Sequence, residues 1–542
     1  MSPFTQYGYL LMAPEIVLTL LGIGLLLVAI FTDHPEHRVN RAVPVVALAG
    51  LALALAAVVW AGGTIVSQSL SEGALNVDRG GHLRVDLLSL FFKGIAIVSA
   101  IIVVMMSVEY SRRFSSPGEF FGLLAFTTLA ASLLCSAADL VTIYLSVEFL
   151  SITSYAMAGY YRENVRSSEA ALKYFLYGAM NSALMLYGLT LLYGLSATGA
   201  MGHPATTNLT EVVRGIAAQL PSPLVLMAVV FTMAGFFFKI SAVPFHQWAP
   251  DTYQGAPTPF TAFLSVASKV AGVAVLVRVV GTLYLVPQAD TGVSSTLAGV
   301  TVFLVAIVAG LSMFIGNILA IQQRDVKRML AYSGIAQIGY MLIAVAAMSG
   351  SNGDQALQAL VVYFIVYLFT NLGAFGVVTA VNNRIHSSDL NDYAGLSQRA
   401  PWLAAAMAVF MFSLAGVPPA AGWLGKYYIF QAAVDPSLRG FFSGGALNTT
   451  DILAFLLVVN SVIGAFYYLW IVKRMYFDAP EVMADFPVER GLKLSVVATM
   501  VITLLLGSLP WPLVTLVQER VTFRVDPPAP PVAVAAPIPP AP

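Results

Sequence analysis

The sequence is poor in charge and in cysteine. Charged residues make up 10% of its 542 residues, whereas soluble globular domains carry about 25%, so the chain has too little charge to cover a water-facing surface. Lys+Arg and Asp+Glu both number 27, which gives no net basic character for binding nucleic acid. The single cysteine, Cys135, excludes an intrachain disulfide and a cysteine-ligated iron–sulfur site.

The sequence also lacks the motifs of cofactor sites. Neither GxGxxG nor GxxxxGK[ST] occurs, so nothing points to nucleotide binding. The six histidines show no helically spaced pair of the kind that binds haem or zinc. We therefore expect this chain to bind no cofactor and no metal of its own.

Long apolar runs are what the sequence has instead. Hydrophobic residues make up 58% of the chain, and its mean hydropathy is +0.82. Since a membrane-crossing helix needs about 20 apolar residues, the runs predict an all-α polytopic membrane protein with about fourteen transmembrane helices. They are expected near 12–32, 42–62, 86–107, 119–137, 139–161, 169–196, 222–248, 258–286, 296–321, 328–350, 355–381, 401–432, 452–475 and 494–517. No Lys or Arg precedes the first run, so we interpret it as a retained helix rather than a signal peptide.

Lysine and arginine are unevenly distributed between the two sets of loops. Sixteen of them border the loops that follow odd-numbered helices, and six border the opposite side. By the positive-inside rule, both termini then face away from the cytoplasm.

Four ionisable residues lie deep within predicted helices, where a charge costs a few kcal/mol. They are Glu148 in the fifth helix, Lys239 in the seventh, Lys269 in the eighth and Lys426 in the twelfth. Two further cations inside predicted helices, Lys93 and Arg278, lie where long side chains snorkel toward the membrane surface.

Proline marks two of the same helices. Pro244 follows Lys239 by five residues, and Pro418 and Pro419 precede Lys426. Because proline removes a backbone donor and clashes with the preceding turn, the seventh and twelfth helices are expected to be broken. Broken helices beside ionisable groups are how transporters build ion sites at the membrane midplane.

The buried charges admit two interpretations. A single Glu–Lys pair can simply hold helices together, but one central glutamate cannot neutralise three lysines. A lysine held between desolvation and a nearby carboxylate takes up and releases a proton as its partner moves, which favours a proton relay. His246, Tyr340 and Tyr363 are further candidates for the proton path. Tyrosines of this kind more often form helix–helix hydrogen bonds, and a capping or loop hydrogen bond explains His246 at least as well.

The order of the helices suggests an internal repeat. The two proline-broken, lysine-bearing helices are five apart, and units with an odd number of helices are inverted relative to each other. We expect inverted units at helices 4–8 and 9–13. The predicted organisation is three N-terminal helices (1–115), a first unit (116–290), a second unit (291–480), a last helix (481–525) and a Pro/Ala-rich tail (526–542).

Several stretches resemble the antiporter-like membrane subunits of respiratory complex I, the proton-pumping NADH–quinone oxidoreductase of bacteria. They include DLVTIYLSVEFLSITSYAMAGYY, FFFKISAVPFHQWAPDTYQGAPTPFTAFLSVASKVAG, NILAIQQRDVKRMLAYSGIAQIGYML and LAGVPPAAGWLGKYYIF, and they are spread over predicted helices 5–12, about half of the chain. Lys426 stands where the M-type members usually carry glutamate, and the chain lacks the long lateral helix of the L type. The N type therefore fits best.

The resemblance implies roles for the buried charges. Glu148, Lys239, Lys269 and Lys426 match the family's proton-relay residues, which transfer protons when quinone is reduced elsewhere in the complex. NADH, FMN, iron–sulfur clusters and quinone are then expected in partner subunits. The implied partners are M-like, L-like, K-like and J-like membrane subunits and lipids, with no nucleic acid, in the bacterial inner membrane. The enzymatic activity is that of the whole translocase.

Three other readings stay open on the sequence alone. A subunit of a multi-subunit sodium/proton antiporter or of a membrane-bound hydrogenase shares the expected fold. A passive scaffold would use the charges only to join helices. A stand-alone secondary transporter would work without partners.

Overall fold

The computed structural model of the chain describes residues 8–32, 42–68, 77, 81–197, 205–217, 222–291, 296–350, 352–434, 448–480 and 486–523. Within these ranges the chain is almost entirely helical, and the β-structure consists of isolated bridges such as that between Asp325 and Asp389. The predicted Pro/Ala-rich tail (526–542) lies outside the described residues.

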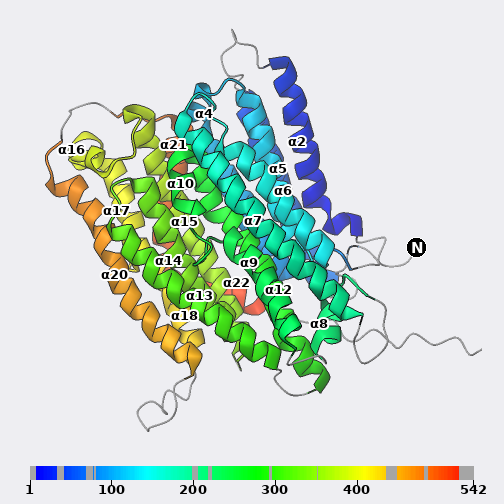
Figure 1. Cartoon of the computed structure of the whole chain (residues 1–542). Coiled ribbons are helices and arrows are strands. Elements are labelled where there is room, and N and C mark those ends of the chain that lie inside the picture. The colour runs from blue at the N-terminus through cyan, green and yellow to red at the C-terminus, as the bar shows by residue number, and fades with distance from the viewer. Residues whose placement is uncertain are drawn as a thin grey trace, which may run out of the picture.

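The helices follow the apolar runs of the sequence (Figure 1). They are α2 (Ala13–Thr32), α3 (Ala42–Gln68), α4 (Leu87–Tyr110), η2 (Ser111–Arg113), α5 (Pro117–Ser136), α6 (Leu140–Ala158), α7 (Val165–Ser196), α8 (Leu209–Ala217), α9 (Pro223–Lys239), α10 (Trp248–Gly255), α11 (Thr258–Phe263), η3 (Leu264–Ser268), α12 (Lys269–Thr291), α13 (Thr296–Ile321), α14 (Val326–Ala347), α15 (Gly353–Ile385), η4 (Leu390–Tyr393), α16 (Leu396–Arg399), α17 (Pro401–Ala415), α18 (Gly422–Ala433), α20 (Thr449–Phe477), α21 (Arg490–Ser508) and α22 (Trp511–Arg520).

An all-α polytopic membrane fold is confirmed. Among the described residues, 12 helices are long and apolar enough to cross a membrane, and two shorter apolar helices, Pro223–Lys239 and Pro401–Ala415, stand at the predicted seventh and twelfth positions. The count of fourteen therefore depends on taking each broken helix as one crossing, and the inverted relation of the two five-helix units stays a prediction.

The helix ends differ from the prediction near the C-terminus. The last predicted helix, 494–517, is two elements in the structure, because α21 ends at Ser508 and α22 begins at Trp511. Pro510 precedes α22 and Pro512 occupies its first turn, where proline starts a helix without losing a hydrogen bond but cannot continue one from the preceding turn.

The helices at the edges of the bundle are much less buried than those in the middle. In Figure 1 the N-terminal helices α2, α5 and α6 lie along one edge and α20 along the opposite edge, with α14 and α15 between them. In their most apolar stretches, the span Thr258–Val286, which includes most of α12, and α14 are 100% and 94% buried, whereas those of α2 and α20 are each 39% buried. The central helices are therefore the ones that carry groups shielded from lipid.

Candidate functional site

Lys239 stands where the seventh helix breaks. It is the last residue of α9, its side chain is 1% exposed, and Ser241 two residues later has a left-handed φ of 60°. The predicted break at Pro244 is confirmed, since helix resumes only at Trp248.

The backbone groups freed by this break find partners inside the protein. The Trp248 indole N–H donates to the Phe238 carbonyl at 3.0 Å. The Val243 N–H donates to the hydroxyl of Ser312 on α13 at 2.9 Å. Non-helical backbone at membrane depth needs such partners because no water or lipid group replaces them.

The Lys239 ammonium faces α6. Its Nζ donates to Ser151 Oγ at 3.1 Å, and Glu148 lies one turn earlier on the same helix face. Glu148 is half-buried and accepts a hydrogen bond from Ser182 on α7. Lys239 and Glu148 interact electrostatically, but within the described residues no ion pair joins them directly. Each of the two charges therefore has a serine hydroxyl as its hydrogen-bond partner.

Lys269 follows a π-helical turn rather than a helix break. It is the first residue of α12, directly after the π-helical turn η3, and π-turns occur frequently at functional sites. The side chain is 1% exposed. Its Nζ has no hydrogen-bond partner in the described part of the chain, and neither do the hydroxyls of Tyr253 and Tyr367.

The space around the Lys269 ammonium is set by a glycine. A Cβ added to Gly334 on α14 would lie 2.5 Å from Lys269 Nζ and 3.2 Å from the Tyr367 hydroxyl. The Tyr253 ring centre lies 5.9 Å from the same nitrogen. Two tyrosines and the bare backbone of α14 thus surround this ammonium with polar groups but no carboxylate.

Lys426 sits at the second broken helix. α17 ends at Ala415, Gly416 has a φ of 90°, and α18 begins at Gly422, which confirms the break predicted at Pro418 and Pro419. Lys426 Nζ donates to the carbonyls of Leu414 at 3.1 Å and Ala415 at 3.0 Å. These are the last carbonyls of α17, where the partial negative end of the helix dipole stabilises a cation.

A network of neutral side chains reaches Lys426 from α14. Gln337 Nε2 donates to the Leu414 carbonyl at 3.3 Å, which also accepts from Lys426. The Gln337 amide also donates to the Tyr468 hydroxyl at 3.1 Å and accepts from the Tyr363 hydroxyl. The candidate Tyr363 therefore belongs to a connected network.

α14 presents these groups in order along one face. Gly334 borders Lys269, Gln337 one turn on belongs to the network, and the Tyr340 ring centre lies 5.0 Å from Lys426 Nζ. Since residues three and four apart share a helix face, a single helix connects the surroundings of Lys269 with those of Lys426 over roughly 9 Å of helix axis.

His246 is the one candidate that the structure leaves apart. It lies in the break between α9 and α10, half-buried, and its Nδ1 has no hydrogen-bond partner among the described residues. Its place on a proton path stays a prediction.

Two buried cations outside this line are paired with carboxylates. Lys93 is fully buried and its Nζ lies 2.8 Å from Glu15 Oε1, which also accepts from Ser132 Oγ at 2.5 Å. Arg278 Nη2 donates to both oxygens of Asp86 at 3.2 and 3.1 Å. The expectation that Lys93 and Arg278 snorkel to the membrane surface was wrong, because each reaches a carboxylate within the bundle.

The Asp86 carboxylate is stabilised in its charged form by the two arginines beside it. It caps the N-terminus of α4, outside the membrane-spanning helix. Burial acts to raise the pKa of Asp86, but the Arg278 and Arg84 guanidinium groups outweigh burial and hold this pKa below its usual value. The carboxylate therefore stays ionised beside its arginine.

Tyr253, Tyr367 and Tyr468 are site residues that the sequence reasoning missed. Tyrosine is common in membrane helices, and no local pattern separates these three from the rest. The one usable signal concerns Tyr367, which follows the candidate Tyr363 by one turn of α15 and so shares its helix face.

Comparisons with known proteins show which family this chain resembles. A family model described as NADH:quinone oxidoreductase/Mrp antiporter, transmembrane, matches residues 137–448. A curated relative from Heliobacterium modesticaldum, named NADH-quinone oxidoreductase subunit N, is 40% identical over 511 residues, covering 93% of this chain and 97% of the relative. One from Rippkaea orientalis, named NAD(P)H-quinone oxidoreductase subunit 2, is 39% identical and covers 81% of each chain.

Solved structures show the same likeness. A chain in a structure of respiratory complex I from Thermus thermophilus superposes with a TM-score of 0.71 at 30% identity, covering 93% of this chain and 98% of that one. A chain of the Mrp complex from Dietzia superposes with a TM-score of 0.75 at 19% identity, covering 95% and 97%. At that identity the second match shows likeness of fold alone.

Proposed function

The chain belongs to the NADH:quinone oxidoreductase/Mrp antiporter family of membrane proteins, and from this premise we propose that Glu148, Lys239, Lys269 and Lys426 form its proton relay. It is a proton-translocating membrane-arm subunit of NADH–quinone oxidoreductase, of the N type. The enzymatic activity is that of the complex.

The observation that carries the proposed relay is the position of its three lysines. Each one lies at an irregularity of a buried helix: Lys239 ends α9, Lys269 follows a π-turn, and the Lys426 ammonium binds the last carbonyls of α17. None of the three forms an ion pair within the described residues. A buried ammonium that is compensated only by neutral dipoles gives up its proton more readily than one fixed to a carboxylate.

The proposed sequence of events begins at Glu148. Quinone reduction elsewhere in the complex shifts the balance between Glu148 and Lys239, which interact electrostatically. Lys239 then passes its proton by way of Lys269 to Lys426, from which the proton leaves. Tyr253 and Tyr367 supply hydroxyls beside Lys269 that can hold a water between the lysines.

α14 supports the last step. Gln337 contacts the same Leu414 carbonyl that binds Lys426, and Tyr340 lies against the Lys426 ammonium. A proton moving from Lys269 to Lys426 thus has polar groups along the whole of the intervening helix face.

The half-exposed position of Glu148 supports a partner on that side. A carboxylate at membrane depth is costly against lipid, so we propose that a neighbouring membrane-arm subunit covers it. The other proposed partners are M-like, L-like, K-like and J-like subunits and membrane lipids, and redox cofactors belong to partner subunits. We place the protein in the bacterial inner membrane with both termini on the non-cytoplasmic side.

Replacing one relay lysine tests the proposal against a passive scaffold. In membrane vesicles, Lys239→Met is expected to reduce NADH-driven proton pumping by about tenfold or more, while the complex still assembles. Lys473→Met is the matched control, because Lys473 is exposed at the end of α20. Pumping at the wild-type rate in an assembled Lys239→Met complex would show that the buried charges only hold helices together.

A further inference from the structure

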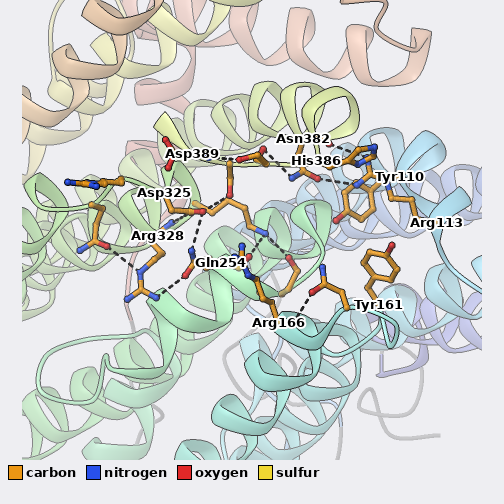
Figure 2. A pocket seen from close by; sticks show the side chains of 18 residues that line it. Tyr110, Arg113, Tyr161, Arg166, Gln254, Asp325, Arg328, Asn382, His386 and Asp389 are labelled. Carbon is orange, nitrogen blue, oxygen red and sulfur yellow. Dashed lines mark hydrogen bonds between the residues drawn. The ribbon is translucent and has the colours of Figure 1, made fainter. Parts of the chain in front are cut away.

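The arginine-rich end of the bundle contains a cavity that the proposed relay does not use. Its volume is about 720 Å³, and it lies where α4 and α15 end, α10 ends, and α7 and α14 begin. Figure 2 shows Tyr110, Arg113 and His386 grouped at one side of it and Arg328 at the other. We call it the arginine cavity.

The walls of this cavity carry an excess of positive charge. Five cationic and two acidic side chains line it. The cations are Arg113, Arg166, Arg324, Lys327 and Arg328, and the acids are Asp325 and Asp389. A concave site lined mainly by one sign of charge concentrates ligands of the opposite sign.

Both acids are engaged by other groups. Asp325 Oδ1 caps α14 by accepting from the Arg328 N–H at 2.9 Å, and its Oδ2 accepts from Ser388 Oγ at 2.5 Å. Asp389 Oδ1 accepts from the Asn391 N–H at 2.9 Å. Within the described residues neither acid forms an ion pair with a cation of the cavity, although Asp325 lies close enough to Lys327 to attract it electrostatically. Five cations against two acids leave the walls with a net positive charge.

Among the described residues, only one of the five cations forms an ion pair with a carboxylate. Arg328 binds Asp251, which also receives Lys173 Nζ at 2.8 Å. Burial acts to raise the pKa of Asp251, but its bonds to Lys173 and Arg328 outweigh burial and lower this pKa. Asp251 is thus an ionised carboxylate shared by two cations, and has no negative charge to spare for the cavity.

The other buried cations are held by neutral oxygens. Lys327 Nζ donates to the carbonyls of Gln254 and Ala256 at 2.8 Å each, which uses two of its three donors. Arg113 donates to the side chain and the carbonyl of Asn382, both at 3.2 Å. These contacts fix the two side chains in place without forming an ion pair in the described part of the chain.

The two remaining arginines, Arg166 and Arg324, indicate that the cavity can accept an anion. Arg166 and Arg324 are exposed, and their guanidinium groups bind no carboxylate in the described part of the chain. Arg166 also lies close enough to Lys327 for their like charges to repel each other. An anion between them would convert this repulsion into two charge-assisted hydrogen bonds.

We propose that the arginine cavity binds a phosphate ester, carried either by an anionic phospholipid headgroup or by a small soluble molecule. Guanidinium groups bind phosphate through paired N–H donors. The volume is that of a site for a small organic ligand, larger than a single inorganic ion requires. Tyr110 and Tyr161 supply flat, hydrogen-bonding walls for the organic part.

The test uses the intact NADH–quinone oxidoreductase complex and two variants of it. Arg166→Gln/Arg324→Gln removes two charges from the cavity without breaking a bond that holds the fold. Arg162→Gln/Arg490→Gln is the matched control, because both residues are exposed and neither lines the cavity. Native gels establish that all three complexes assemble equally.

Two measurements then distinguish the source of the phosphate. Mass spectrometry counts the phosphatidylglycerol retained after reconstitution in phosphatidylglycerol–phosphatidylcholine vesicles, and titration measures binding of glycerol 3-phosphate. A lipid ligand predicts one fewer retained phosphatidylglycerol in the cavity variant alone. A soluble ligand predicts glycerol 3-phosphate binding weakened about tenfold in that variant alone. Equal results for all three complexes in both measurements would overturn the proposal, and neither readout depends on proton pumping.

Discussion

Two groups of buried cations in this protein are neutralised in opposite ways. In the paired corner, Lys93 contacts Glu15 at 2.8 Å and Arg278 contacts Asp86 at 3.1 Å. Along the lysine line of Lys239, Lys269 and Lys426, the ammonium groups meet hydroxyls, carbonyls and aromatic rings instead. The depth of burial is similar in both, so burial alone does not separate a structural charge from a functional one.

The difference lies in what happens when a proton leaves. Removing a proton from Lys93 would leave Glu15 as an unpaired buried carboxylate, which is strongly unfavourable. Removing one from Lys269 or Lys426 leaves only neutral groups in contact with the lysine, and Lys239 has no direct ion pair to lose within the described residues. The paired corner is therefore suited to holding helices together, and the lysine line to exchanging protons.

The largest effect on stability is expected from breaking the Glu15–Lys93 ion pair of the paired corner. Lys93→Met should destabilise the subunit by about 3–5 kcal/mol, because Glu15 is then buried without a partner. The measurement is the amount of assembled complex on native gels and its thermal stability. Glu15→Gln/Lys93→Met removes both charges and should recover most of the loss. A single variant as stable as the wild type would show that this pair contributes nothing.

A smaller effect on assembly, but a large one on pumping, is expected on the lysine line. Lys269→Met should assemble at wild-type levels, because Lys269 leaves behind no charged partner. NADH-driven pumping in vesicles should fall by about tenfold or more. If this variant failed to assemble, as Lys93→Met is expected to, the contrast between the two regions would be lost.

The smallest effect is expected from a single methyl group. A Cβ at Gly334 would lie 2.5 Å from Lys269 Nζ, and since that atom is the end of a flexible side chain, the lysine would move while the helices stay packed. Gly334→Ala should therefore preserve thermal stability and slow pumping several-fold, by roughly 1 kcal/mol in barrier height. Gly299→Ala on α13 is the control, because its added Cβ meets no atom within 4 Å. Equal pumping by both variants would remove Gly334 from the site.

The lysine line was predictable because its signals are local. A lysine inside an apolar run, as at Lys239, is conspicuous, and proline a few residues away marks the helix break. The partners were not predictable for the opposite reason. Lys93 and Glu15 belong to different helices, so nothing in either run indicates that the two side chains meet.

The same limit applies to the neutral part of the site. Gly334 looks like any other glycine of a membrane helix until the lysine beside it is placed. The π-turn before Lys269 leaves no mark in the residue types of LSVAS. Tyr468 reaches Gln337 only because α20 packs against α14, and such contacts depend on how whole helices pack.

The Glu15–Lys93 pair has a consequence for how the protein is made. Glu15 belongs to α2, which is synthesised before α3 and α4, and Lys93 of α4 follows it by 78 residues. At roughly 5–20 residues per second, the carboxyl group waits about 4–16 s for its partner. Because Glu15 lies in the first turn of α2, it can stay hydrated at the membrane surface during that time. The arrival of α4 then draws α2 into the bundle, so that α2 is secured only after α3 and α4 have entered the membrane.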